Sequence, residues 1–358
     1  MAGHPRRVAL VIGQLSRGGA EGQIAQLTRE LDRSRFELLV YCLSAQTEPV
    51  GSDIAANGTV IRVLTGGRLS RVRQLLHALD ADRIDLVHAW LYLANAAAAT
   101  AHLLRPSRPL ITSARNCKVQ GPFNHMANAV AFRSSQAIVA NSQGVATYIT
   151  HQYWAPRDRI RVIYNGIDVD RFRPDEHSGG TLGPIVTVGR LVKQKNHDMF
   201  LRAAARLAQE VNEVRFFIVG SGPLRHALEE QARALRIADR VAFAGERDDV
   251  ELILRGASLF WMTSRWEGMP NVVLEAMASG VPVIGTDAGG TRELIRSGVD
   301  GFITALGDAE AFVRHSLELL RDAAMRQRFA TAARQRAEEF STARMVDGIS
   351  RLYDQVLG

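Results

Sequence analysis

The sequence predicts an α/β protein built from two tandem doubly wound domains, each a parallel sheet covered by helices on both faces. Three observations favour this fold class. Short continuous apolar runs alternate with amphipathic stretches along the chain, as buried parallel strands alternate with crossover helices. The 358 residues exceed what one hydrophobic core normally organises. A polar Gly/Pro-rich passage, NGIDVDRFRPDEHSGGTLGP, interrupts the alternation, which then restarts.

The first half begins with an apolar run at Val8–Ile12, a glycine loop and an amphipathic segment at Ala20–Leu31. The longest apolar stretch, Leu86–Leu104, contains two histidines and an asparagine, so it predicts a strand and a buried helix and not a membrane span. The further strands predicted in this half are Phe36–Leu43, Val60–Leu64, Leu86–Ala89, Leu110–Thr112, Ala137–Ala140 and Arg161–Tyr164.

The second half repeats the pattern, and we divide the chain into domains at 1–172 and 173–341. A last helix, Thr342–Leu357, places Met345, Ile349, Leu352 and Tyr353 at helical spacing, which predicts core packing. The strands predicted here are Ile185–Val188, Arg215–Val219, Val241–Ala244, Leu259–Met262 and Val281–Thr286. The helices predicted are Asp198–Gln209, Leu224–Leu235 and a helical region over Ala309–Glu339.

Composition narrows the class of protein. With 46% hydrophobic and 23% charged residues the chain is an ordinary globular protein. The Arg6-Arg7 start runs directly into a strand, so we expect no secretory signal peptide. The only cysteines, Cys42 and Cys117, lack metal-type spacing and fit a reducing cytoplasm.

The net charge of +7 lies entirely in the first half of the chain. Residues 1–180 carry 21 Lys+Arg against 14 Asp+Glu, whereas residues 181–358 carry 23 of each. This asymmetry predicts an acidic partner such as anionic lipid or a phosphate-bearing acceptor. Arginine-rich genomic composition is the alternative explanation. Nucleic acid is not expected, because the arginines are scattered without interleaved aromatic residues.

The segment SRWEGMPNVVLEAMASGVPVIGTDAGG carries the most informative pattern. A helix is predicted at Asn271–Ser279, with Pro270 at its start. Glu267 then lies in the preceding loop and Glu275 in the second turn, on either side of backbone N–H groups near Met269 that would attract an anion. A sugar nucleotide, with a diphosphate between two polyols, matches an anion site flanked by carboxylates. An ordinary solvated helix start with two surface glutamates is the alternative.

Other strand ends carry weaker signals. Arg190 and Lys195 follow one strand and could converge on a diphosphate, where cations stabilise a departing phosphate. The alternative is a solvated loop. GSGPLR is not a dinucleotide fingerprint, because Arg225 stands where the third glycine belongs. The remaining strand ends are the glycine loop with Gly18 and Gly19, and the segment from Phe243 to Gly245, whose backbone could hold a nucleobase.

Taken in order, these segments make the chain similar to the retaining glycosyltransferases of the GT-B fold, which include bacterial mannosyltransferases and sucrose-phosphate synthases. The resemblance runs through GGAE, VIYNGIDVDRF, GRLVKQKNH, VGSGPL, VAFAGERDDV and the segment with Glu267 and Glu275. It implies retaining transfer of a sugar from a nucleoside diphosphate sugar, with UDP-sugars the most frequent donors, to an acceptor hydroxyl. Bacterial polysaccharide, lipopolysaccharide or glycolipid synthesis is the implied setting.

The resemblance also implies roles for individual residues. Arg190 and Lys195 would bind the diphosphate, Glu267 the hydroxyls of the donor sugar, and Glu275 the ribose; Arg190, Lys195 and Glu267 form the implied catalytic set. The family places no protein nucleophile, so the glutamates are expected to bind and not to act as an acid/base pair. The further implied donor-binding positions are Gly18, Gly19, Phe243, Gly245, Gly268, Met269, Asn271 and Leu274.

One departure concerns the first domain, where many members carry a histidine after the strand equivalent to Leu110–Thr112. This chain reads ITSARNCK there, so Arg115 or Asn116 is the candidate replacement for sugar or acceptor contact. His125 is expected to be a surface or core residue. The missing histidine supports a non-catalytic nucleotide-sugar binder as an alternative. An epimerase or phosphorylase on the same fold is a second alternative, and the failed glycine fingerprint argues against a nicotinamide oxidoreductase.

The resemblance implies no metal and no cofactor, with the nucleotide sugar as substrate. The implied partners are that donor, a saccharide or lipid-linked acceptor, and an anionic membrane surface reached by the basic first half. The protein is therefore expected in the cytoplasm, peripheral to the inner face of the membrane. In such a fold the last helix, 342–358, is expected to cross back to the first domain and permit hinge closure.

Overall fold

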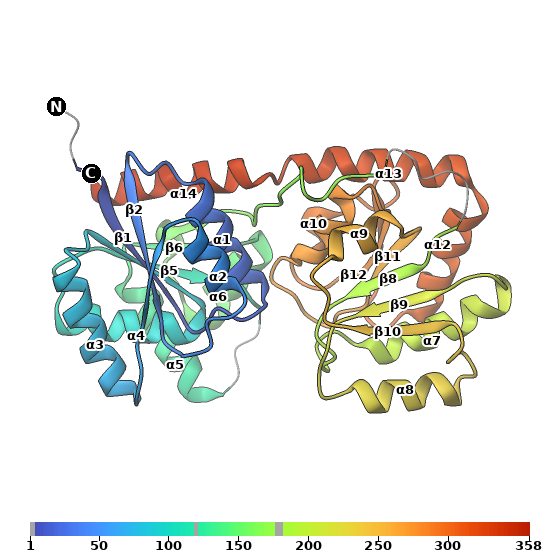
Figure 1. The fold of residues 1–358 in the computed structure, drawn as a ribbon, viewed down its shortest axis with the longest axis horizontal. Helices are drawn as coiled ribbons and strands as arrows, with labels where there is room; N and C mark the ends of the chain where they lie inside the picture. The colour runs from blue at the N-terminus through green and yellow to red at the C-terminus, as the bar shows by residue number, and fades with distance from the viewer. Residues whose placement is uncertain (1–3, 118–120, 176–181) are drawn as a thin grey trace. The chain divides into compact units, whose positions relative to one another are not determined.

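The computed structural model describes residues 4–117, 121–175 and 182–358. The chain forms two compact units (Figure 1). Unit 1 consists of Met1–Gly166 and Thr342–Gly358, and unit 2 consists of Ile167–Ser341. Each unit contains one parallel sheet with helices on both faces, so the predicted fold class is confirmed.

The sheet of unit 1 has seven strands in the order β3-β2-β1-β4-β5-β6-β7, and all its pairs are parallel. The order reverses between β1 and β4, and in such sheets ligands bind beyond the carboxyl ends of the strands at the reversal. The strands are β1 (Arg6–Ile12), β2 (Phe36–Cys42), β3 (Val60–Val63), β4 (Leu86–Trp90), β5 (Leu110–Ala114), β6 (Ala137–Ala140) and β7 (Ile160–Val162).

Two helical layers enclose this sheet. The first layer, α1 (Gly19–Glu30), α2 (Val50–Ala56) and α14 (Thr342–Leu357), packs on one face through a shared apolar cluster. The second, α3 (Arg68–Ala81), α4 (Leu91–Leu104) and α5 (Pro122–Ser134), packs on the other face, and α6 (Gln143–Tyr153) packs beside α5. The predicted core role of α14 is confirmed for Met345, Ile349, Leu352 and Tyr353, all buried in unit 1.

The prediction of a buried helix within Leu86–Leu104 is only half right. The alanine-rich side of α4 packs on the sheet, with Ala94, Ala98 and Ala101 fully buried. Its outer side is exposed, and Leu104 leaves 68% of its surface open to solvent. A helix without any charge need not be buried all round, because a single layer of helices covers each face of the sheet.

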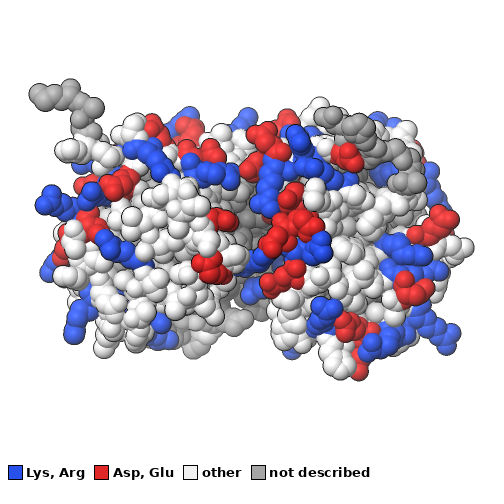
Figure 2. Space-filling model, in the orientation of Figure 1, with Lys and Arg blue, Asp and Glu red and all other residues white. Residues whose placement is uncertain are grey.

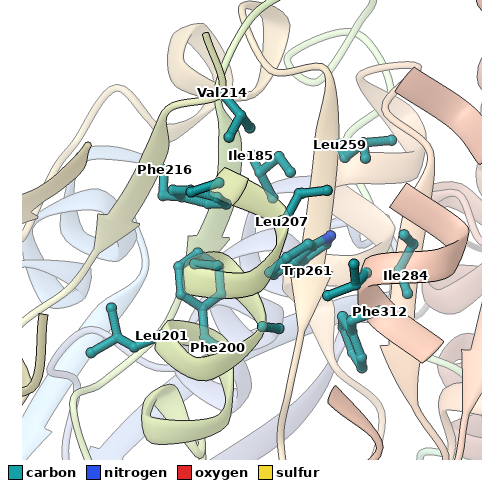
Figure 3. Packing of buried hydrophobic residues seen from close by; sticks show 14 of the residues in the cluster. Ile185, Phe200, Leu201, Leu207, Val214, Phe216, Leu259, Trp261, Ile284 and Phe312 are labelled. Carbon is teal, nitrogen blue, oxygen red and sulfur yellow. The ribbon is translucent and has the colours of Figure 1, made fainter. Parts of the chain in front are cut away.

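The sheet of unit 2 has six strands in the order β10-β9-β8-β11-β12-β13. Its core centres on Trp261 of β11, whose ring lies 5.3 Å from that of Phe200 and 5.5 Å from that of Phe312 (Figure 3). The strand β13 was not predicted. The strands are β8 (Ile185–Val188), β9 (Phe216–Val219), β10 (Val241–Gly245), β11 (Leu259–Met262), β12 (Val283–Thr286) and β13 (Gly301–Thr304). The helices are α7 (His197–Glu210), α8 (Arg225–Ala234), α9 (Val250–Arg255), α10 (Asn271–Ala278), α11 (Thr291–Leu294), α12 (Ala309–Arg321) and α13 (Ala323–Glu338).

The boundary between the units lies at Gly166 and Ile167, earlier than the predicted 172/173. Ile167 and Phe172 are both buried. The guanidinium of Arg334 on α13 donates to the backbone carbonyls of Val169 and Phe172 and to that of Ala278, the last residue of α10. The start of the polar passage is therefore part of unit 2, and residues 176–181 of the passage lie outside the described residues.

Candidate functional site

The loops that follow β8 and β11 in unit 2 are joined by a network of hydrogen bonds. The backbone N–H of Arg265 donates to the Gln194 carbonyl at 2.8 Å. The Gln194 side chain donates to the Trp266 carbonyl at 2.9 Å, and the Thr263 hydroxyl donates to the Lys195 carbonyl at 2.9 Å. These bonds hold two strand ends together and fix the backbone from which the predicted donor-binding side chains extend.

Lys195 and Glu267 form an ion pair at the end of this network. The Lys195 Nζ lies 2.8 Å from Glu267 Oε1, and both side chains are mostly buried. Gln194 Nε2 also lies 3.5 Å from the other carboxylate oxygen of Glu267. In this mostly buried place the ammonium of Lys195 and the carboxylate of Glu267 neutralise each other. A ligand anion could take the place of the carboxylate beside Lys195, and a ligand donor group could take the place of the ammonium beside Glu267.

The helix that was predicted over Asn271–Ser279 is confirmed as α10, Asn271–Ala278, with Pro270 as its N-cap. Glu275 lies in the second turn of this helix. Its side chain forms no hydrogen bond with any residue that the structure describes. Burial raises the pKa of the Glu275 carboxyl to about 7. The charges of Arg171 and Lys195 partly oppose this rise in pKa.

A carboxyl with open acceptor capacity at a helix start is suited to receive hydrogen bonds from ligand hydroxyls. Near Glu275, Arg171 is held in place by an ion pair with Glu251 of α9 at 2.9 Å. Arg171 belongs to the polar passage that the sequence treated as a linker. The passage therefore contributes a cation to the surroundings of Glu275, which sequence reasoning missed.

The GSGP turn packs directly against the loop after β8. The N–H of Gly189 donates to the Val219 carbonyl, and the N–H of Leu191 donates to the Ser221 carbonyl. Gly220 has φ 133°, and a Cβ built there would lie 2.1 Å from the Gly189 carbonyl oxygen. A side chain at Gly220 would therefore separate the two loops.

The segment that was predicted to hold the nucleobase, at the end of β10, is hydrogen-bonded to the GSGP turn that follows β9. Gly220 N–H donates to the Gly245 carbonyl at 2.7 Å, and the register of β10 shifts between Phe243 and Gly245. Arg225 donates to the Phe243 carbonyl at 3.2 Å. Arg225, the residue that spoils the dinucleotide fingerprint, thus contacts the strand end that was predicted to hold the base.

The other predicted donor-binding residues have different surroundings. The Arg190 side chain is exposed and forms no hydrogen bond or ion pair with the residues described, so the structure joins Lys195 to Glu267 but does not join Arg190 to either. Leu274 is 1% exposed, so its side chain packs in the core and supports α10 from inside. Gly268 and Met269 are buried, and Asn271 is half-buried at the start of α10.

His197, at the start of α7, is a site residue that sequence reasoning missed. Its imidazole is buried next to the backbone of Gly189 and Arg190, and burial lowers its pKa to about 4. The ring is therefore neutral and supports the loop that carries Arg190 and Lys195. This histidine is the last residue of the GRLVKQKNH motif, to which the sequence analysis gave no role.

In unit 1 the predicted Gly18 is the N-cap of α1, and Gly19 is its first residue. Glu21, in the first turn of α1, is buried. A Cβ at Gly18 would lie 2.2 Å from a carboxylate oxygen of Glu21. The lack of a side chain at Gly18 therefore makes room for a buried carboxylate just beyond the carboxyl end of β1.

Arg115 follows β5 and stacks on the ring of Trp90 at 3.8 Å. Its Nη1 donates to Asn165 Oδ1 at 2.8 Å, while its buried Nε has no hydrogen-bond partner among the described residues. Burial lowers the pKa of Arg115 to about 9, and the charge of Glu21 opposes that change. Asn116 is half-buried beside it. The predicted replacement for a histidine is thus a stacked, enclosed cation.

Two histidines of unit 1 have structural surroundings. His125 stacks on Tyr153 at 4.3 Å, which agrees with the expected surface or core role. His88 is fully buried in β4, with Nδ1 2.8 Å from the Tyr353 hydroxyl and Nε2 2.8 Å from the Ser113 hydroxyl. Burial holds the pKa of His88 well below its usual range. Sequence reasoning missed this link between β4 and α14.

The described part of the chain contains neither a metal-type cluster of side chains nor a helix that could span a membrane. Within 4–117, 121–175 and 182–358, there is no group of three or more His, Cys, Asp or Glu side chains arranged to hold a metal ion. In the same ranges, none of the helices has the length and hydropathy needed to span a bilayer.

Comparison with known families matches both halves of the chain. Residues 17–171 match the glycosyltransferase family 4 model, and residues 168–336 match the model of glycosyl transferases group 1. The chain is 32% identical over 203 residues to the lipopolysaccharide core biosynthesis glycosyltransferase LpsE of Rhizobium meliloti, a match that covers 56% of this chain and 58% of LpsE. It is 27% identical over 331 residues to the putative glycosyltransferase EpsF of Bacillus subtilis, covering 85% of this chain and 84% of EpsF. The match thus spans less than two thirds of the first of these relatives.

Solved structures show the same fold. HepE from Anabaena, solved in complex with UDP-glucose, superposes with a TM-score of 0.86 at 22% identity over 98% of this chain and 99% of HepE. The sucrose-phosphate synthase of Thermosynechococcus elongatus gives a TM-score of 0.81 at 18% identity, with 98% of both chains covered. At these identities the likeness concerns the fold alone.

Proposed function

The chain belongs to the glycosyltransferases of the GT-B fold, with a family 4 domain followed by a group 1 domain, and from that premise we propose a specific activity. It transfers a sugar from a nucleoside diphosphate sugar, most simply a UDP-sugar, to an acceptor hydroxyl with retention of the anomeric configuration. The acceptor belongs to the synthesis of a polysaccharide, a lipopolysaccharide or a glycolipid.

The observation that carries the proposal is the arrangement of Lys195, Glu267 and Glu275 in unit 2. A buried ion pair stands next to a helix start, and a carboxyl with open acceptor positions lies one turn further along the helix. A diphosphate would draw the Lys195 ammonium, and the hydroxyls of the donor sugar would then hydrogen-bond to Glu267. The ribose hydroxyls would bind Glu275.

The comparisons support the donor class. HepE was solved with UDP-glucose, and an Escherichia coli relative, 29% identical over 208 residues and matched over 54% of its length, is a UDP-Gal:alpha-D-GlcNAc-diphosphoundecaprenol alpha-1,3-galactosyltransferase. A uridine diphosphate donor and a saccharide acceptor are therefore the simplest extension to this chain.

In the proposed reaction the acceptor hydroxyl attacks the anomeric carbon from the face that the diphosphate leaves. The bond from the anomeric carbon to the acceptor oxygen forms while the bond to the diphosphate oxygen breaks, and a diphosphate oxygen takes the acceptor proton. The protein then needs no nucleophile. Its contribution is orientation of the donor and stabilisation of the leaving charge, mainly by Lys195, with Arg190 moving in from its exposed position.

The test is a thermal-shift panel of the purified protein with UDP, GDP, ADP and NAD, repeated on Glu275→Ala. A ligand that binds the native state raises the melting temperature by mass action. We expect a shift with one nucleoside diphosphate that is lost in Glu275→Ala and kept in Glu213→Ala, a control at an exposed glutamate of the same unit. A shift with NAD alone, or none with any diphosphate, would overturn the proposal.

A second experiment tests the chemistry. The protein is incubated with the UDP-sugar selected by the panel and an acceptor, with and without EDTA, and the anomeric configuration of the product is read by proton NMR. Retention, with the rate unchanged by EDTA, is the expected result. Inversion would contradict the mechanism, and release of free or epimerised sugar would favour an epimerase or phosphorylase.

A further inference from the structure

The polar passage at the start of unit 2 lies against the end of α10. Nη1 of Arg334 donates to the Phe172 carbonyl at 2.7 Å and to the Ala278 carbonyl at 2.9 Å. Because one nitrogen contacts both oxygens, Phe172 lies beside the last turn of α10. Glu275 precedes Ala278 by three residues, a spacing that makes two residues neighbours on a helix. The passage therefore reaches α10 about one turn after Glu275.

Arg171, the residue before Phe172, is held by α9. Its guanidinium pairs with Glu251 at 2.9 Å and donates to the Asp248 carbonyl at 3.3 Å. Nη2 of Arg255, the last residue of α9, donates to the Arg171 carbonyl at 3.3 Å. The helix α9 in turn packs on α10. Both the backbone and the side chain of Arg171 are therefore fixed next to the helix that carries Glu275.

The ion pair of Arg171 and Glu251 is partly open to solvent. The side chain of Arg171 is 54% exposed and that of Glu251 is 21% exposed. In Figure 2, blue and red side chains lie side by side on the part of unit 2 over α9 and α10. A surface ion pair contributes little to stability, because water and salt screen it. The contacts of Arg171 therefore matter mainly for where they place its charge.

Several other charges lie on the elements that pack against α10. Arg334 and Arg255 donate to backbone carbonyls, and Arg292 pairs with Asp287 at 2.6 Å. These cations are therefore engaged away from Glu275. The set of charges comprises Arg171 of the passage, Glu251 and Arg255 of α9, Arg292 and Glu293 of α11, Arg334 of α13, and Lys195 and Glu267 of the strand-end loops.

Two cations and one anion of this set act on the carboxyl of Glu275. Burial raises the pKa of Glu275, the charge of Arg171 opposes this rise more than that of Lys195 does, and the charge of Glu251 adds to it. Lys195 is already paired with Glu267, and the proposed diphosphate would balance its charge. Arg171 is fixed by α9, so its charge should stay beside Glu275 when the donor binds.

We propose that Arg171 is a positioning residue for donor binding, whose charge holds Glu275 as the carboxylate that receives the ribose hydroxyls. The inference rests on the proposed function of unit 2 and adds to it a residue from the passage between the units. An ionised carboxylate accepts hydrogen bonds from hydroxyls more strongly than a protonated one. Arg171 acts through Glu275, so its effect on the donor depends on pH.

The first measurement is isothermal titration of the full chain with UDP from about pH 6 to about pH 9. Arg171→Gln should bind UDP about threefold more weakly than the wild type at about pH 6, and equally at about pH 9, where Glu275 is ionised in both. Arg171→Lys keeps the charge and should stay close to the wild type. Arg173→Gln removes an exposed arginine two residues away and should match the wild type. The readout is the ratio of affinities, because the ionisation of UDP is common to all four proteins.

The second measurement needs no ligand. Glu275→Gln is introduced into the wild type and into Arg171→Gln, and its effect on the free energy of unfolding is followed with pH in urea. Without Arg171 the carboxyl of Glu275 should keep its proton to higher pH. The gain from Glu275→Gln should then level off at higher pH in the Arg171→Gln background, and the unfolding equilibrium should differ between the backgrounds by about threefold at that plateau.

Four outcomes would overturn the inference: an affinity ratio that does not change with pH, the same loss in Arg173→Gln, no recovery in Arg171→Lys, or the same effect of Glu275→Gln in both backgrounds. The two measurements also separate this inference from the proposed function. If the wild type binds UDP and the backgrounds do not differ, the inference alone fails. If the backgrounds differ and the wild type does not bind UDP, the proposed function fails, and the role of Arg171 in donor binding fails with it.

Discussion

Replacing Glu275 with Gln should remove a pH-dependent loss of stability from unit 2. Burial raises the pKa of Glu275 to about 7 in the folded protein, against an ordinary value of 4.5. Between these two values the folded state keeps the proton and the unfolded state has lost it. The free energy of unfolding therefore falls as the pH rises through this window, and it is lowest once both states are ionised.

The size of this effect follows from the two pKa values. Each pH unit in which only the folded state holds the proton changes the free energy of unfolding by about 1.36 kcal/mol. From the ordinary pKa to about 7, the loss amounts to at most about 3 kcal/mol. Glutamine has nearly the same volume and no proton to lose. The advantage of Glu275→Gln over the wild type should be smallest at about pH 5, close to the unfolded pKa, and should grow to at most about 3 kcal/mol at about pH 8.

The assay is urea unfolding of both proteins at intervals from about pH 5 to about pH 8, with the difference between the two as the readout. Glu213→Gln, at an exposed position of the same unit, is the control and should follow the wild type throughout. If Glu275→Gln loses stability in parallel with the wild type, the carboxyl does not titrate with a raised pKa and the reasoning is refuted.

The same ionisation should govern donor binding. Hydroxyl groups donate to an ionised carboxylate more strongly than to a protonated one. The affinity of the wild type for UDP should therefore fall by up to about tenfold for each pH unit below 7. Glu275→Gln should bind UDP weakly at every pH, with no such dependence. Isothermal titration at several pH values measures both.

Three further predictions concern single changes. Lys195→Ala should lower turnover by about 10²–10³-fold, because the cation that stabilises the leaving diphosphate is lost. Lys193→Ala, at an exposed position two residues away, should leave the rate unchanged. Steady-state kinetics measures both rates. Gly220→Ala should destabilise unit 2 by about 2 kcal/mol or more and weaken UDP binding, because its Cβ would lie 2.1 Å from a carbonyl oxygen; urea unfolding and titration measure these effects. Tyr353→Phe should destabilise unit 1 by about 1–2 kcal/mol in urea, because it removes the hydroxyl that lies 2.8 Å from the buried His88.

Controls separate these effects from general damage. Gly256→Ala changes a glycine of unit 2 with negative φ and no atom closer than 3.8 Å to the new Cβ, so it should be nearly neutral. Tyr92→Phe removes an exposed hydroxyl from unit 1 and should leave the free energy of unfolding unchanged. Full activity of Lys195→Ala with the true substrates would disprove the assignment of Lys195. Gly220→Ala as stable as Gly256→Ala, or Tyr353→Phe as stable as the wild type, would contradict the packing described.

Most strands could be predicted because each is a short apolar run bounded by polar residues. The bounds Leu259–Met262 of β11 and Thr342–Leu357 of α14 were predicted to the residue. The strand β13, Gly301–Thr304, was missed because its four residues begin with glycine and end with threonine, which leaves too little apolar signal. The same limit applies to helix burial. The spacing of residues in α4 is apolar all round, and only the tertiary structure shows which side the sheet covers.

The proposed donor-binding residues could be nominated from the sequence because they lie in local motifs at the ends of β8 and β11. The interactions that position them were not readable, because they join residues far apart in the sequence. The contact from Lys195 to Glu267 spans two strand ends, and Arg334 holds the passage that carries Arg171 against the end of the helix that carries Glu275.

In unit 1 the sequence motifs are weaker than in unit 2. No local motif of unit 1 identifies the proposed acceptor, and the polar groups at its strand ends, the stacked cation of Arg115 and the buried carboxylate of Glu21, follow different strands. A donor needs a few fixed hydrogen bonds to atoms that all nucleotide sugars share, so few residues suffice and they form motifs. An acceptor-binding surface can be built from many sequences that keep only its shape, charge and hydropathy. The identity of the acceptor is therefore better sought by binding experiments on unit 1 than by motif comparison.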